Sequence, residues 1–152
     1  VLLVRRLEVL DLLLGLGFSD QPVLHKEFKD KYDETFREQM LAQVQRANHG
    51  GTNDSDAMAV ALDMLSQRSS DNEKIVVVIT DGQGKEAALR EQIALAEKAG
   101  VKVIGVGIGD GMSYVNQVYP ESVTVSRINE LPYELTDLIR DKIVDGLDNQ
   151  GR

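Results

Sequence analysis

One uninterrupted apolar run constrains this fold more than any other stretch of the sequence. Residues 75–79 read Ile-Val-Val-Val-Ile and end abruptly in Thr80, Asp81 and Gly82. Five consecutive β-branched side chains without polar alternation are typical of a strand buried on both faces within a parallel sheet. We therefore expect Asp81 at the carboxyl end of a central strand, the edge where open α/β sheets place their ligands. Because Asp-Gly also marks ordinary turns, this pattern alone leaves a turn and a site as alternatives.

Strand and helix patterns alternate along most of the remaining sequence. This alternation, with right-handed crossovers, predicts an α/β fold: a three-layer doubly wound, mostly parallel sheet with one antiparallel edge strand. The length of 152 residues predicts a single domain over 1–152. Hydrophobic periodicity and glycine or proline punctuation place the elements. The predicted strands are 1–4, 15–20, 23–28 (the edge strand), 75–79, 101–108 and 122–125, and the predicted helices are 7–14, 33–48, 57–65, 85–98, 112–119 and the stretch from 129 onward.

The charge balance limits the classes of partner. The chain has 25 acidic and 17 basic residues and a formal net charge of -8, with no basic cluster. Such a surface argues against nucleic acid or an anionic membrane as the main partner. There is no cysteine, which excludes disulfides, thiolate metal sites and cysteine nucleophiles. No apolar segment approaches the roughly 20 residues of a membrane span, and no signal-peptide pattern is expected.

Several polar loops are predicted to meet at the carboxyl edge of the sheet. They contain Ser19 and Asp20, residues 50–54, Asp81 and Asp110. Hydroxyl and carboxylate oxygens without sulfur suit Mg²⁺, Mn²⁺ or Ca²⁺ rather than zinc.

Two of these stretches together resemble a known family. Residues 50–53 (Gly-Gly-Thr-Asn) and 80–82 (Thr-Asp-Gly) are similar to motifs of the von Willebrand factor A domain, and residues 17–20 and 105–109 match its second and fifth strands. The resemblance implies a metal-ion-dependent adhesion site and no catalytic residue. It assigns Thr52 as the second-loop hydroxyl ligand and Asp81 as the third-loop carboxylate. A carboxylate from a partner protein would complete the coordination of the cation.

The sequence departs from this family in one respect. The Asp-x-Ser-x-Ser loop that follows the first strand in the family is absent, and Val4 is followed directly by Arg5. We hypothesise that this metal loop is missing between those two residues. One carboxylate and one hydroxyl hold Mg²⁺ poorly, so we expect weak or absent metal binding. Asp54 or Asp56 could compensate, although both suit the start of a helix.

Three functions follow as alternatives. The first is a non-catalytic protein-binding module whose divalent cation binds an Asp or Glu of a partner. The second is an accessory subunit of a chelatase, because residues 122–125 and 129–131 resemble the A-domain of cobalt and magnesium chelatase subunits; this implies a cytoplasmic protein and a partner such as a MoxR-type AAA+ ATPase. The third is a phosphoryl-transfer enzyme with Asp81 as nucleophile. Gln83 stands where such enzymes would have a second Asp, and only His25 and His49 offer imidazole bases.

Overall fold

The fold, obtained as a computed structural model, combines one sheet with helices on its face. The structure describes residues 2–6, 13–27, 30, 33–35, 38–39, 42, 51–68, 74–127, 129–130 and 134. Along the chain its elements are β1 (Leu2–Arg6), β2 (Leu13–Phe18), β3 (Pro22–Lys26), α2 (Asp54–Ser66), β4 (Lys74–Thr80), α3 (Glu86–Lys98), β5 (Val101–Ile108), η1 (Met112–Tyr114), α4 (Val115–Val118) and β6 (Glu121–Val125).

The strands of the described residues form one sheet in the order β3-β2-β1-β4-β5-β6. β4, β5 and β6 are parallel neighbours, joined by crossovers through α3 and through η1 with α4. Helical crossovers between parallel strands are the basis of Rossmann-like folds. The predicted α/β class is therefore confirmed.

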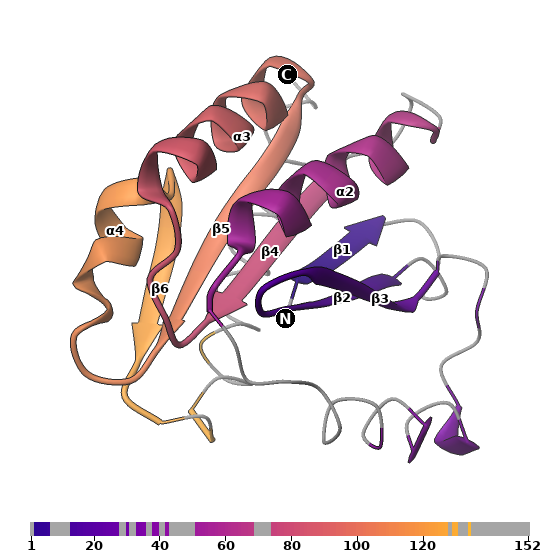
Figure 1. Ribbon diagram of the computed structural model, residues 1–152, viewed down its shortest axis with the longest axis horizontal. Helices are drawn as coiled ribbons and strands as arrows, with labels where there is room; N and C mark the ends of the chain where they lie inside the picture. Colours follow the sequence, from indigo (N-terminus) through magenta and orange to yellow (C-terminus); the bar gives the residue numbers. More distant parts are fainter. Residues whose placement is uncertain are drawn as a thin grey trace, which may run out of the picture.

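The central strand β4 is covered on both faces, as its composition predicts. Val76 and Val78 belong to a core with side chains of α2, α3 and α4, and Figure 1 shows these three helices on one side of the sheet. Ile75 and Val77 point to the opposite face and are each 3 % exposed. They form a second core with Ile104 and Val106 of β5. Alternate side chains of a strand face opposite ways, so a run without polar residues serves two cores.

Glycines in β5 let α4 lie close to the sheet. A Cβ atom at Gly105 would collide with the ring of Tyr119, and one at Gly107 would lie 2.7 Å from Cβ of Met112. Side chains at these positions would push η1 and α4 outward. The interleaved glycines therefore serve close packing, as their place within a strand predicts.

The amino-terminal strands differ from the prediction. β1 runs unbroken through Val4 and Arg5 and is antiparallel to both β2 and β4. With the β2–β3 pair, three of the five neighbouring pairs are antiparallel, so the sheet is less parallel than expected. Arg6 pairs with Lys74, so β1 ends at the edge opposite Asp81. The absence of a metal loop between Val4 and Arg5 stays a prediction.

The predicted helix over residues 7–14 is wrong at its end. Leu13 and Leu14 lie in β2 and pair with Arg5 and Val4, because leucine is compatible with either structure and strand pairing decides between them. Residues 7–12 lie outside the described part. So does most of the predicted helices 33–48 and 129 onward, although the described residues 34–35, 38–39, 42 and 134 are helical. Among the helices that the structure describes, none has the length and apolar character to span a bilayer.

Candidate functional site

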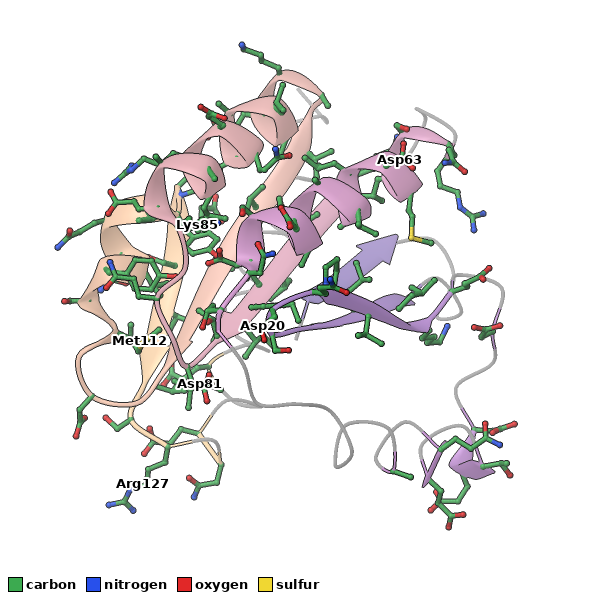
Figure 2. All side chains as sticks on the ribbon, viewed as in Figure 1. Asp20, Asp63, Asp81, Lys85, Met112 and Arg127 are labelled. Atoms are coloured by element: carbon green, nitrogen blue, oxygen red, sulfur yellow. The ribbon has the colours of Figure 1, made fainter. Side chains whose placement is uncertain are left out.

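The ends of β2 and β4 meet the start of α2 at one edge of the sheet. Because β1 is antiparallel to both strands, β2 and β4 run in the same direction and end at the same edge. Figure 2 shows Asp20 and Asp81 at this edge. We call residues 19–20, 51–54 and 81–84 the edge loops. The predicted gathering of polar loops is therefore present for these three segments.

Hydrogen bonds join the segment before α2 to the end of β2. The Gly51 amide donates to Asp20 Oδ1 at 2.6 Å, and the Asn53 amide donates to the Ser19 carbonyl at 2.8 Å. The Asn53 side chain also donates to the Asp20 carbonyl at 3.0 Å. Thr52 lies between these anchored residues, so its backbone is held on both sides.

The turn after β4 rests directly on Thr52. Thr80 Oγ1 donates to the Gly82 carbonyl at 2.9 Å and accepts from the Gly82 amide at 3.2 Å, which closes a tight turn. A Cβ atom at Gly82 would collide with Thr52 Oγ1. The Thr52 hydroxyl therefore lies against the residue that follows Asp81, so the two predicted ligands belong to loops that meet at this edge. Asp81 is exposed and Thr52 is partly buried.

A buried carboxyl group lies beneath this turn, and sequence reasoning missed it. Asp54 opens α2, is 1 % exposed, and accepts a hydrogen bond of 3.3 Å from Tyr114 Oη on its Oδ2 atom. Its Oδ1 atom has no hydrogen-bond partner. Burial raises the pKa of this carboxyl, and hydrogen bonds from Tyr114 and the Ser55 backbone oppose part of the rise.

The sequence contained a signal for the burial of Asp54. Positions 54, 58, 61 and 65 share one face of a helix, and the last three are Met58, Ala61 and Leu65 of the core. Asp56, the other acid considered, is exposed and accepts a hydrogen bond of 2.7 Å from Asn53 Nδ2. Asn53 caps the helix by accepting from the Asp56 amide. Only Asp56 behaves as an ordinary helix-start residue.

Two tyrosines continue this buried polar group. Burial and the neighbouring Asp54 raise the pKa of Tyr114 to about 12. Tyr119 is 4 % exposed, and its hydroxyl has no hydrogen-bond partner. Burial, with a smaller effect of Asp54, raises its pKa as well. Both phenols stay neutral at physiological pH, so Asp54 is the one group of the three that can carry charge there.

The edge loops match a hard divalent cation in the kind of donor they offer. Thr52 supplies a hydroxyl and Asp81 a carboxylate, both oxygen ligands that Mg²⁺ accepts. Within the part of the chain that the structure describes, no three His, Cys, Asp or Glu side chains cluster closely enough to hold a metal ion. Asp54 is covered by the 81–84 turn and Asp56 is bonded to Asn53, so neither adds an obvious ligand. Thr52 and Asp81 are suitable oxygen donors for a divalent cation, but two protein ligands are few, so we expect weak cation binding.

Comparison with known proteins identifies the family. The model of the von Willebrand factor type A domain matches residues 15–130, a span that contains all the edge loops. The chain belongs to the von Willebrand factor type A domain family. Domains of this family are protein-interaction modules. A search of curated proteins finds no match for this von Willebrand factor A domain.

Solved structures share the fold at low sequence identity. Proximal thread matrix protein 1 from the mussel byssus is 21% identical with a TM-score of 0.68, and the match covers 84% of this chain and 34% of that protein. A form of the same protein with a zinc-occupied metal-ion-dependent adhesion site has the same identity and TM-score, with 84% and 33% covered. This von Willebrand factor A domain thus spans about one third of the length of the structure it matches. At this identity the likeness shows the fold alone.

Proposed function

We propose that this von Willebrand factor A domain is a non-catalytic module that binds an acidic side chain of a partner protein through a divalent cation at the edge loops. The observation that supports this most directly is the contact between Thr52 and Gly82, which puts the Thr52 hydroxyl beside the loop that carries Asp81. The adhesion site of the byssus protein, occupied by zinc, supports a divalent cation in this fold.

The protein's own residues have defined tasks in this proposal. Asp81 is exposed and supplies the negative charge, while Thr52 supplies a neutral oxygen from a partly buried position. The bonds from Gly51 and Asn53 to the end of β2 hold Thr52 at the edge before a partner arrives. A bound cation would supply positive charge for the carboxylate of the partner. Preorganised donors lower the entropy cost of binding.

Calorimetric titration with Mn²⁺ tests the cation site. We expect a dissociation constant of about 1 mM, the weak end of hard-cation sites. Asp81→Asn should weaken binding at least about tenfold, because it removes the charged donor of the proposed Thr52–Asp81 pair. Asp63→Asn, which removes an equal charge from an exposed position of α2 away from Asp81 (Figure 2), is the matched control and should change the affinity less than about twofold. Equal losses in both variants would indicate diffuse attraction and contradict the proposal.

Peptide binding tests the partner chemistry. In the presence of Mg²⁺, a peptide with a central Asp should bind more tightly than the same peptide with Asn, and a chelator should abolish the difference. Equal binding of both peptides would contradict recognition of a carboxylate. A chelatase-like AAA+ ATPase as partner, a MoxR-type protein among them, and a cytoplasmic location stay predictions from the resemblance. No contact among the described residues favours Asp81 as a nucleophile.

A further inference from the structure

Two glycines in the turn after β4 fit against two side chains at the start of α2. Gly82 lies on Thr52, and Gly84 lies on Asp54. A Cβ atom at position 84 would collide with Asp54 Oδ1 and lie 2.8 Å from its Cγ atom, a separation that real Cβ contacts do not show. The backbone of the turn that carries Asp81 therefore packs directly against the start of α2 and the residues before it. Gly82 packs on Thr52, and Gly84 packs on Asp54.

Tyr114 lies beside both Asp54 and the backbone of Gly84. The Tyr114 hydroxyl donates to Asp54 Oδ2, and Tyr114 is 9 % exposed within η1, which follows β5. Met58, one turn further along α2, is fully buried. The Asp54 carboxyl group is thus buried beside both the 81–84 turn and Tyr114 of η1.

Hydrogen bonding at the helix start, where the Ser55 backbone donates to this carboxyl group, does not by itself account for its burial. Asn53 already caps α2, and Asp54 Oδ1 has no hydrogen-bond partner. An acid buried with an unpaired oxygen lowers the stability of the fold. The contact that its Oδ1 atom makes is with Gly84, in the loop of the proposed site. A role in placing that loop explains the position of the group better than a role in the helix.

We infer that Asp54 is a positioning residue: held by Tyr114, its carboxyl group seats Gly84 and so sets the separation between Thr52 and Asp81. The packing of Gly84 on Asp54 follows from the contacts above. The importance of this packing for cation binding rests on the proposed function. The inference explains why two glycines flank Gln83, since a side chain at either position would lift the turn from α2.

Amide hydrogen exchange without metal tests whether the Asp54 carboxyl group holds the 81–84 turn in place. The Gly82 amide, which donates to Thr80 Oγ1, reports on the turn, and the Ile93 amide in α3 reports on global opening. Asp54→Ala and Tyr114→Phe should each speed exchange at Gly82 about tenfold relative to any change in the exchange of Ile93. Asp54→Asn keeps the size and an acceptor for Tyr114, so its Gly82 exchange should stay within about threefold of the parent.

A double variant tests the contact between the two positions. Gly84→Ala should speed exchange at Gly82, and Gly84→Ala with Asp54→Ala should restore slower exchange because the new methyl group takes the place of the carboxyl group. Unchanged Gly82 exchange in both Asp54→Ala and Tyr114→Phe would overturn the inference, even if Gly84→Ala fails to fold.

The same variants separate this inference from the proposed function. If the parent protein binds Mn²⁺, Asp54→Ala should weaken binding at least about threefold, and Asp54→Asn should restore it. If the parent binds no Mn²⁺, the proposed function fails, but the exchange measurements still show whether Asp54 holds the 81–84 turn in place. Loosened exchange with an unchanged Mn²⁺ affinity would overturn the positioning role.

Discussion

At the scale of single residues, the edge loops depend on places where only a small residue or one polar atom fits. Gly82 and Gly84 bring backbone directly onto Thr52 and Asp54, and Gly105 brings the ring of Tyr119 onto the sheet. Asp54 and Tyr114 form a buried polar pair between these contacts. Such positions are sensitive to changes of a single methyl group or a single proton.

Tyr114 predicts a loss of stability in strong alkali. Its pKa rises from the ordinary 10.0 to about 12 in the folded protein. The folded state therefore holds the phenol proton more tightly, and this contribution to stability is complete below pH 10 and is lost as the pH rises through about 12. Urea unfolding at a series of pH values should show a smaller alkaline loss in Tyr114→Phe than in the parent. An identical loss in both proteins would contradict the burial of this phenol.

Gly105→Ala should destabilise the fold through overpacking. The new methyl group would collide with the ring of Tyr119, and such collisions in a packed core cost about 1–3 kcal/mol. Chemical unfolding measures this change in the free energy of unfolding. Ala87→Ser, on the exposed first turn of α3, is the control, and its free energy of unfolding should stay within about 0.5 kcal/mol of the parent's. A neutral Gly105→Ala would mean that α4 is not packed as closely as described.

At the scale of elements, composition predicted the central strands and helices well. The β-branched run became β4, and the capped stretches became α2 and α3 with ends within a few residues of the prediction. The leucine-rich start was harder, because leucine suits helices and strands alike and the pairing of Arg5 with Leu13 decided the outcome. Pairing partners are distant in sequence, so local periodicity does not reveal them.

The candidate site was predictable to the same extent. Placing Thr52 and Asp81 at one edge needed only strand direction and loop position. The burial of Asp54 and its bond to Tyr114 join residues 60 positions apart, and a helix-start acid is ordinarily solvated. The one sequence signal for the burial of Asp54 was its helical spacing from the apolar residues on the buried face of α2.

The cap of α2 gives a prediction at this scale. Asn53→Ala removes the acceptor for the Asp56 amide and the donor to the Asp20 carbonyl. Loss of such a cap should lower the free energy of unfolding by about 1 kcal/mol. Asp63→Ala, an exposed position within α2, is the control and should have little effect in the same urea titration. A larger loss in the control would contradict the assigned cap.

At the scale of the whole molecule, the hydrophobic cores on both faces of the sheet hold in place the strand that carries the edge loop with Asp81. Val76 and Val78 join the helices to one face, and Ile75 and Val77 bury the other. This double burial holds the end of β4 rigidly, so Asp81 is presented from a stable strand. The family and the fold are those of a protein-interaction domain, and the binding chemistry follows from the loops at that edge.

Paramagnetic broadening by Mn²⁺ in nuclear magnetic resonance spectra tests the central claim most directly. The account predicts that trace Mn²⁺ first broadens the amide signals of Thr52, Asp81 and Gly82, and that Asp81→Asn removes this effect while Asp63→Asn preserves it. Broadening centred on other acidic groups, such as the exposed Glu86 and Glu91 of α3, or spread evenly over the surface, would contradict a cation site between Thr52 and Asp81.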